Sequence, residues 1–278
     1  MTSAQTILVT GASGSIGRAL RTGVLGSPHR VIYSARQPGP GFVDLDVTDE
    51  SRLDDVISTY TPDVIVHLAA MIGPSCEADP LGAQALNVEA TKLLAASARR
   101  GTVARIVFAS TAAVYGDSFH APVPESGRLD PRSHYARTKL EAERLLREAT
   151  RTGTGLQVVI LRIFNVWGPG FPESVATRAC LSTGHEPIVF RGRDEFVRDY
   201  VHSDDVATAI ALSSTVPLAA SCVVLNIGSG VPTANSTLIA RARERGRAIE
   251  IVEGLPSYSC ADISRARAVL GYDPRRLP

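Results

Sequence analysis

The sequence predicts an α/β fold in which a parallel sheet is covered by helices on both faces. Short runs rich in Val, Ile and Leu recur through the first half of the 278-residue chain, and longer amphipathic segments separate them. Continuous apolar runs of this kind suit strands that are buried on both faces of a parallel sheet. A glycine-rich turn follows the first run. Alternation of strands and helices in this order is typical of doubly wound α/β folds.

Five strands and four helices account for the regular part of the pattern. We expect strands at Thr6–Thr10, Arg30–Ser34, Asp63–Leu68, Arg105–Ser110 and Gln157–Ile163, and helices near 15–25, 50–60, 82–100 and 133–151. The last helix carries Leu140, Leu145 and Leu146 among many charges, so one of its faces should pack on the sheet.

The alternation stops at a segment that contains Gly168, Pro169, Gly170 and Pro172, and the pattern beyond it is short and irregular. We therefore predict a dinucleotide-binding domain over residues 1–168. Residues 169–278 should form a smaller, partly interleaved region that is mainly substrate-binding.

Composition and charge exclude several functional classes. The chain has 29 Lys and Arg against 28 Asp and Glu, a formal net charge of +1, and only two of the cations are lysines, Lys92 and Lys139. Evenly spread arginines argue against a nucleic-acid partner or a polybasic membrane anchor. The four cysteines lack metal or disulfide spacing, so we expect free thiols and no metal. With no signal peptide or membrane span, the sequence predicts a cytoplasmic protein.

The first apolar run leads directly into a three-glycine turn that then enters a helix. In that context the pattern indicates a Rossmann-type dinucleotide site. Gly11 permits the tight turn, Gly14 lets backbone approach a pyrophosphate, and Gly17 lets the helix pack close to the strand. The diphosphate would lie at the helix N-terminus, where N–H groups and the dipole favour an anion. The remaining loop positions that we assign to the cofactor are Ser13, Ser15 and Ile16.

The residues after the second predicted strand bear on the choice of dinucleotide. NAD sites usually place an Asp or Glu there for the ribose 2′-hydroxyl, whereas this chain has Ser34-Ala35-Arg36. The guanidinium of Arg36 could clamp a 2′-phosphate with paired hydrogen bonds, and Ser34 could support it. We therefore favour NADP(H), with NAD(H) as the alternative. Arg36 could also be one more surface arginine.

A series of short segments resembles the extended short-chain dehydrogenase/reductase family, in particular its NAD-dependent epimerase/dehydratase group, which modifies nucleotide sugars. The resemblance covers most of the chain, and the order and spacing of the segments carry it. The segments are Thr10–Gly17, Asp44–Asp46, His67–Ala70, Ser110–Gly116, Tyr135–Lys139, Arg162–Asn165, Arg198–His202 and Asn226–Gly228.

The resemblance implies further cofactor contacts. Asp46 and the adjacent Val47 would lie at the adenine ring, and Phe164 would help to fix the nicotinamide face. Core packing is the alternative for Leu68 and Phe164, and a helix N-cap or a turn is the alternative for Asp46. The remaining positions that the resemblance implies for the cofactor are Leu68, Ala69, Ala70 and Asn87, the last with a partly structural role.

Tyr135 and Lys139 are four residues apart, so on a helix they share a face. A cation beside a phenol favours the phenolate and should lower the Tyr135 pKa. Such a tyrosine can exchange a proton with a substrate oxygen while hydride moves at the adjacent carbon. Thr111 follows an apolar strand, where its hydroxyl can reach the same oxygen. In the resemblance these three residues are the catalytic Ser/Thr, Tyr and Lys, and Tyr135 and Lys139 also contact the cofactor.

The substrate side is less clearly marked. Asn165 and Arg198 look like the family's contacts to the substrate diphosphate, and Thr111 and Tyr135 would meet the sugar. A salt bridge to a neighbouring acid, Asp194, Asp199 or Asp204, is the alternative for Arg198. Arg178 and Arg191 are weaker substrate candidates. His134 and Cys76 could line the sugar site or could equally be packing or surface residues.

Two positions constrain the reaction that the resemblance implies. Ala112 and Ala113 stand where sugar-nucleotide dehydratases carry an Asp-Glu pair, so we exclude dehydration. Arg36 stands where NAD-holding 4-epimerases carry an acid. We therefore expect an NADPH-dependent ketoreductase that acts on a nucleotide-activated keto-sugar. The alternatives are a 4-epimerase with bound NAD and a non-catalytic NADP-binding regulator. The resemblance also implies a homodimer, with the helices near 82–100 and 133–151 at its interface.

Overall fold

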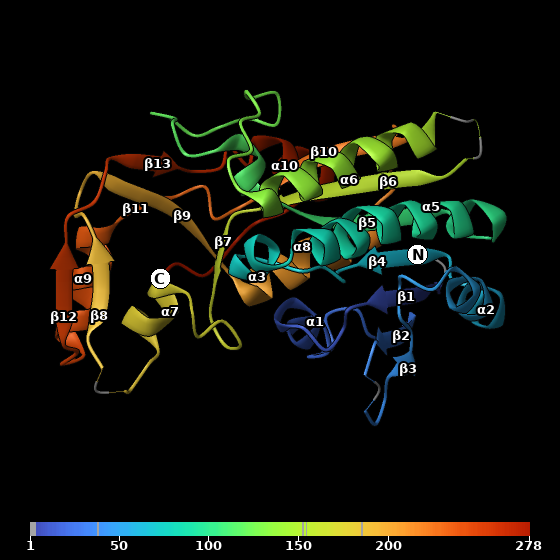
Figure 1. Ribbon diagram of the computed structural model, residues 1–278, viewed down its shortest axis with the longest axis horizontal. Helices are drawn as coiled ribbons and strands as arrows, with labels where there is room; N and C mark the ends of the chain where they lie inside the picture. The colour runs from blue at the N-terminus through green and yellow to red at the C-terminus, as the bar shows by residue number, and fades with distance from the viewer. Residues whose placement is uncertain (1–3, 38, 152, 154, 185) are drawn as a thin grey trace.

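The computed structural model describes residues 4–37, 39–151, 153, 155–184 and 186–278. Its main sheet is parallel and seven-stranded, in the order β10-β6-β5-β4-β1-β2-β3 (Figure 1). The order runs outward in two directions from β1 and β4, which places a switch point at their carboxyl ends. The strands are β1 (Thr6–Thr10), β2 (Arg30–Ala35), β3 (Val43–Asp44), β4 (Val64–His67), β5 (Arg105–Thr111), β6 (Gln157–Ile163) and β10 (Cys222–Ile227).

Helices cover both faces of this sheet, as the sequence predicts. On one face, α2 (Glu50–Tyr60), α5 (Ala90–Arg100) and α6 (His134–Thr150) share a hydrophobic core with the strands. On the other face, α1 (Ser15–Leu20), α8 (Ser203–Thr215) and α10 (Ser264–Leu270) share a second core. The predicted doubly wound, Rossmann-type α/β fold is confirmed.

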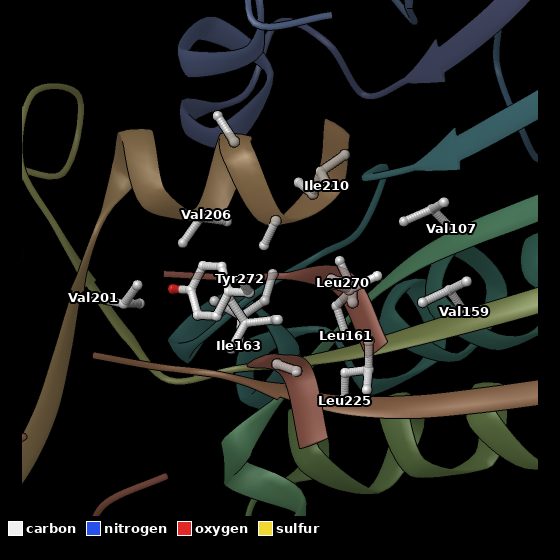
Figure 2. Packing of buried hydrophobic residues seen from close by; sticks show 14 of the residues in the cluster. Val107, Val159, Leu161, Ile163, Val201, Val206, Ile210, Leu225, Leu270 and Tyr272 are labelled. Carbon is white, nitrogen blue, oxygen red and sulfur yellow. The ribbon is translucent and has the colours of Figure 1, made fainter. Parts of the chain in front are cut away.

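The second core shows how the C-terminal half completes the sheet. Side chains of α8, α10 and the segment after α10 pack on residues of β5, β6 and β10 (Figure 2). Tyr272 is buried there and donates a hydrogen bond to the Gly228 carbonyl at 2.9 Å. Strand β10 pairs with β6 from Val158 to Ile163. Residues beyond 168 therefore supply a strand and two covering helices to the main sheet.

Two predicted helices differ from the structure. The helix expected at 15–25 ends at Leu20, and Gly23 in the following turn has a φ of +103°, which a helix does not accommodate. The helix expected at 82–100 is divided into α4 (Pro80–Gln84), a π-helical turn at Ala85–Glu89, and α5. The long helix expected at 133–151 is α6, whose N-cap Ser133 accepts a hydrogen bond from the Ala136 N–H.

The remaining elements form a smaller lobe, at the left of Figure 1. β8 (Ile188–Arg191) pairs with β12 (Ile249–Val252), and α7 (Val175–Cys180) and α9 (Asn235–Glu244) pack with them. β9 (Phe196–His202) pairs with β7 (Asn165–Trp167), β11 (Pro232–Ala234) and β13 (Ser257–Ser259). The short α3 (Pro74–Ala78) precedes α4.

All four cysteines are free. Among the described residues, no helix has both the length and the apolar character that crossing a bilayer requires.

Candidate active site

A cleft of about 880 Å³ opens at the carboxyl ends of β1 and β4. One wall is the glycine loop with the residues after β4, and the other wall is formed by β9 and the segment between β7 and α7. This is the switch point of the sheet, where ligands of doubly wound folds bind. The predicted site residues that line this cleft are Gly11, Gly14, Ser15, Ile16, Gly17, Leu68, Ala70, Asn165 and Arg198.

The glycine loop has the geometry that a dinucleotide diphosphate requires. Gly11 has a φ of +67°, and a Cβ there would lie 2.5 Å from the Ala69 backbone nitrogen. A Cβ on Gly17 would lie 2.4 Å from the Ala12 carbonyl oxygen. Gly14 instead faces the cleft. The conformational roles expected of Gly11 and Gly17 are thus confirmed, and the loop residues present fit a bound dinucleotide, which Gly14, Ser15 and Ile16 would hold.

The three predicted catalytic residues lie together beside the cleft. Thr111 ends β5 and caps a 3₁₀ turn, where its hydroxyl accepts a hydrogen bond from the Ala113 N–H at 3.2 Å. Tyr135 lies in the first turn of α6 and is hydrogen-bonded to the Thr111 side chain. Lys139 follows one turn later, is buried, and places its Nζ 4.0 Å from the centre of the Phe108 ring. Spacing along one helix therefore unites Tyr135 and Lys139, and a strand end brings Thr111 to them.

Burial has the largest effect on the pKa values of Tyr135 and Lys139. It raises the pKa of Tyr135 to about 12, although the hydrogen bond with Thr111 opposes the rise. It also lowers the pKa of Lys139 to about 7, against the charge of Glu143, which favours the ammonium. The expectation that Lys139 lowers the Tyr135 pKa is wrong for the ligand-free protein, because desolvation penalises both charged forms.

Arg198 lies on the opposite wall of the cleft. Its Nη2 donates to Ser257 Oγ at 2.8 Å and lies 3.7 Å from Asp117 Oδ2. Its guanidinium also stacks 3.9 Å from the centre of the Phe196 ring. The acid beside Arg198 is therefore Asp117, rather than one of the neighbours in sequence that we considered. Asn165 donates to the Asp199 carbonyl at 3.0 Å.

Two further hollows adjoin this wall. One of about 290 Å³ is lined by Thr111, Ala113, Phe164, Asn165 and Arg198 among others, and so joins a predicted catalytic residue to the predicted diphosphate contacts. Another, of about 790 Å³, is lined by Arg191, Asp117 and Arg132 among others.

Three of the weaker substrate candidates have structural partners or are buried. Arg178 is half-buried, donates a hydrogen bond to the Pro187 carbonyl and lines a separate surface hollow. His134 donates its backbone N–H to Glu77 Oε1, and its ring contacts the Pro80 carbonyl at 3.2 Å. Cys76 is fully buried.

Several predicted cofactor contacts have structural partners instead. Ser34 is fully buried and donates to the Val9 carbonyl at 3.1 Å, so it does not offer its hydroxyl to a phosphate as we expected. Asn87 is buried and its amide holds the Met71 backbone and Thr138 Oγ1, so it braces the loop after β4 against α6.

The adenine-site candidates belong to the turn before α2. Asp46 Oδ1 accepts hydrogen bonds from the N–H and the hydroxyl of Thr48, the turn role that we weighed as the alternative. Val47 is packed in the core. Ser13 and Arg36 are both exposed. No group of three or more His, Cys, Asp or Glu within the described ranges is arranged to hold a metal ion.

Comparison with known proteins decides the family. The sequence model described as the NAD dependent epimerase/dehydratase family matches residues 7–228. The chain belongs to this family.

Curated relatives of the chain are epimerases. A UDP-glucose 4-epimerase of Rhizobium leguminosarum bv. trifolii is 31% identical over 306 residues, which cover 98% of this chain and 93% of that protein. A UDP-glucose 4-epimerase of Rhizobium meliloti (strain 1021) is 33% identical over 257 residues, 83% of this chain and 78% of that protein.

Solved structures agree. MoeE5 in complex with UDP-glucuronic acid and NAD is 31% identical with a TM-score of 0.86, covering 98% of this chain and 94% of that one. UDP-glucose 4-epimerase of Thermotoga maritima with UDP-glucose is 26% identical with a TM-score of 0.84 and the same coverage. The NADP(H) preference inferred from Arg36 has no support in these relatives, because the MoeE5 complex contains NAD.

Our sequence analysis of this epimerase/dehydratase family member missed three groups of cleft residues. Arg18 lines the cleft and donates to the Ser13 carbonyl at 2.9 Å; its spacing of four from Gly14 along the first helix was the available signal. Phe196 and Tyr200 line the cleft with Arg198, as the period of two along a strand predicts. Arg132 and Asp117 had no local signal, because only tertiary contacts bring them to the site.

Proposed function

We propose that the protein is an NAD-dependent nucleotide-sugar 4-epimerase that acts on UDP-hexoses. The observation that carries the proposal is the placement of Thr111, Tyr135 and Lys139 beside a cleft whose other wall presents Arg198 and Asn165. Relatives that cover nearly the whole chain are UDP-glucose 4-epimerases, which supports this reaction over the reduction that we first expected. The role of each residue below is part of the proposal.

The chain's own residues divide the work between sugar and diphosphate. When bound, NAD supplies a reversible hydride acceptor beside the sugar. Tyr135 Oη takes the proton of the 4-hydroxyl and later returns it to the same oxygen after the sugar has presented its other face. Thr111 Oγ1 hydrogen-bonds that oxygen. Arg198 and Asn165 bind the diphosphate and leave the hexose free to turn.

The ligand-free titration of Tyr135 sets a condition on this mechanism. With a pKa of about 12, the phenol does not ionise at neutral pH without a nearby positive charge. Lys139, one turn along α6, supplies that charge when it is protonated. Ala112 and Ala113 bring no acid to the sugar, so a dehydration has no proton donor at these positions.

The test is interconversion without an added reductant. Purified protein is incubated separately with UDP-glucose and UDP-galactose, and with the corresponding uronic acid and N-acetyl pairs, and the products are separated by chromatography. We expect one pair to reach the same mixture from either side, and Tyr135→Phe to abolish the conversion. Absence of conversion for every pair, together with stoichiometric NADPH oxidation by a nucleotide keto-sugar, would overturn the proposal.

Ketoreduction remains the second candidate because Arg36, an exposed cation, directly follows β2 at a position where an acid would favour NAD. Binding of NAD(H) and NADP(H) to the wild type and to Arg36→Ala separates the two. Under the epimerase proposal NAD binds more tightly, and the substitution changes its dissociation constant by less than about twofold. A loss of tight NADPH binding in Arg36→Ala would favour the reductase instead.

A further inference from the structure

A buried ion pair joins β6 to α6, the helix that carries Tyr135 and Lys139. Arg162 of β6 and Glu143 of α6 have side chains that are 2% and 1% exposed, and Arg162 Nη2 donates to Glu143 Oε2 at 2.7 Å. Arg162 Nε donates to Glu143 Oε1 at 3.0 Å, so the guanidinium engages both carboxylate oxygens. The mechanism proposed above uses neither residue. Stability alone does not explain an ion pair buried this completely, because apolar residues of similar size often stabilise a core equally well.

The Glu143 carboxylate ties together the three elements that carry the catalytic machinery. It belongs to α6, one turn after Lys139 and two turns after Tyr135. Its Oε1 accepts a hydrogen bond from Ser110 Oγ at 2.6 Å, and Ser110 directly precedes Thr111. Its partner Arg162 lies on the strand that leads to Phe164 and Asn165. One carboxylate thus holds the end of β5, the end of β6 and the catalytic face of α6 in a common position.

Among the acidic groups that favour the charged form of Lys139, the same carboxylate has the largest effect. Desolvation by burial lowers the Lys139 pKa, and Glu143 opposes it. The His67 imidazole is buried and its pKa is lowered to about 3, so it stays neutral and adds no second positive charge beside Lys139. Burial raises the pKa of the Cys76 thiol, which is therefore also neutral at pH 7. The ionisable groups that face Lys139 from the packed elements are Tyr135 and Glu143 on α6, Cys76 on α3, and His67 on β4.

We propose that Glu143 is a positioning residue that keeps Lys139 protonated and holds Thr111 and Tyr135 in register. The structure contains an ion pair of Glu143 with Arg162, and Glu143 acts on Lys139 through its electrostatic field. The activity part of this inference rests on the epimerase function proposed above, whereas the titration part does not. Removal of the charge should move the Lys139 titration midpoint down, so the ammonium persists only at lower pH.

The lysine content of the chain makes a direct measurement practical. Protein labelled with ¹³C and ¹⁵N in lysine has two side-chain signals, from Lys92 and Lys139, and Lys92→Arg assigns them. We expect the Lys139 signal to titrate near pH 7 in the wild type and about one pH unit lower in Glu143→Gln. The alkaline limb of the epimerisation rate should shift downward by the same amount. Glu141→Gln, an exposed acid on the same helix, should shift neither.

Loss of the pair could prevent Glu143→Gln from folding, because it leaves the Arg162 guanidinium buried without its carboxylate partner. The double variant Glu143→Met/Arg162→Met removes both charges with apolar side chains of similar length and supplies the same titration. It should also show a lowered Lys139 midpoint. An unchanged midpoint in the folded variants would overturn the inference and leave Glu143 a structural residue. A shifted midpoint in a protein that epimerises no sugar would instead retain the inference on Lys139 and reject the proposed function.

Discussion

The two walls of the cleft are built by different means. The wall at the sheet edge depends on backbone geometry and close packing over short stretches of chain, such as the contact of Gly17 with the backbone of Ala12. The β9 wall depends on charged and polar side chains from distant segments. Asp117 there accepts a hydrogen bond from Ser257 Oγ at 2.8 Å, and these two residues are 140 positions apart.

This difference separates the proposed chemical step, at the sheet edge, from the proposed substrate binding, on β9. The proposed catalytic and dinucleotide-binding groups lie on or next to elements of the main sheet and on α6. The proposed substrate contacts depend on side chains that hold one another, as Arg198 depends on Asp117 and Ser257. Changes at the sheet edge should therefore affect folding or the chemical step, and changes on β9 should mainly affect substrate affinity.

The largest effect is expected from Tyr135→Phe. Removal of the proton-transferring hydroxyl should lower kcat by about 10²–10⁴-fold, because general acid–base catalysis contributes that much. NAD content and the unfolding transition should remain near those of the wild type. Tyr60→Phe, on α2, serves as the matched control. Wild-type activity of Tyr135→Phe would show that the chemical step does not depend on this residue.

Gly11→Ala should reduce the free energy of unfolding by about 3 kcal/mol, measured by urea titration. The new Cβ meets the Ala69 backbone, and alanine is disfavoured at a φ of +67°. Gly23→Ala also places alanine at a positive φ, of +103°, but nothing lies within 4 Å of the new Cβ. It should cost about 1 kcal/mol. Equal losses in the two variants would show that close packing of the loop contributes nothing.

Lys139→Met tests the cost of the buried ammonium. The Lys139 pKa is about 7 in the folded protein against 10.5 for the free side chain. Between these values the unfolded chain binds the extra proton, so wild-type stability rises with pH, and below pH 7 the folded state bears the full cost of the buried charge. The stability of Lys139→Met relative to wild type should therefore be greater at pH 6 than at pH 9, by on the order of 2 kcal/mol.

The exposed second lysine provides the comparison for that measurement. Lys92→Met should show the same pH dependence of unfolding as the wild type. If Lys139→Met also followed the wild type from pH 6 to pH 9, Lys139 would not titrate in this range.

The smallest effect is expected on the β9 wall. Arg198→Met should raise the KM for the nucleotide sugar roughly tenfold, about 1.5 kcal/mol, through loss of charged hydrogen bonds to the diphosphate. kcat should change by less than about threefold. Arg193→Met, an exposed arginine of the neighbouring loop, should leave both constants unchanged. A fall in kcat that exceeds the rise in KM would contradict the division between the two walls.

Particular residues show where sequence analysis succeeded. The roles of Gly11 and Gly17 could be predicted from the neighbouring sequence, since a tight turn between a strand and a helix has few allowed backbone conformations. Neither position has room for a Cβ. Tyr135 and Lys139 could be paired because a helix has a fixed period. Ser34 was misassigned because a hydroxyl at a strand end can face either the cleft or the core, and here it bonds the Val9 carbonyl.

The sequence by itself determined the doubly wound fold and the family, and it proposed the catalytic set, because strand and helix periods and short motifs act over a few residues. Tertiary structure decided which charges meet. It placed Asp117 beside Arg198, paired Glu143 with Arg162, and lowered the pKa of one of the two lysines while the other stayed exposed. Burial and long-range contact govern electrostatic energies, and neither can be inferred from the spacing of residues along the chain.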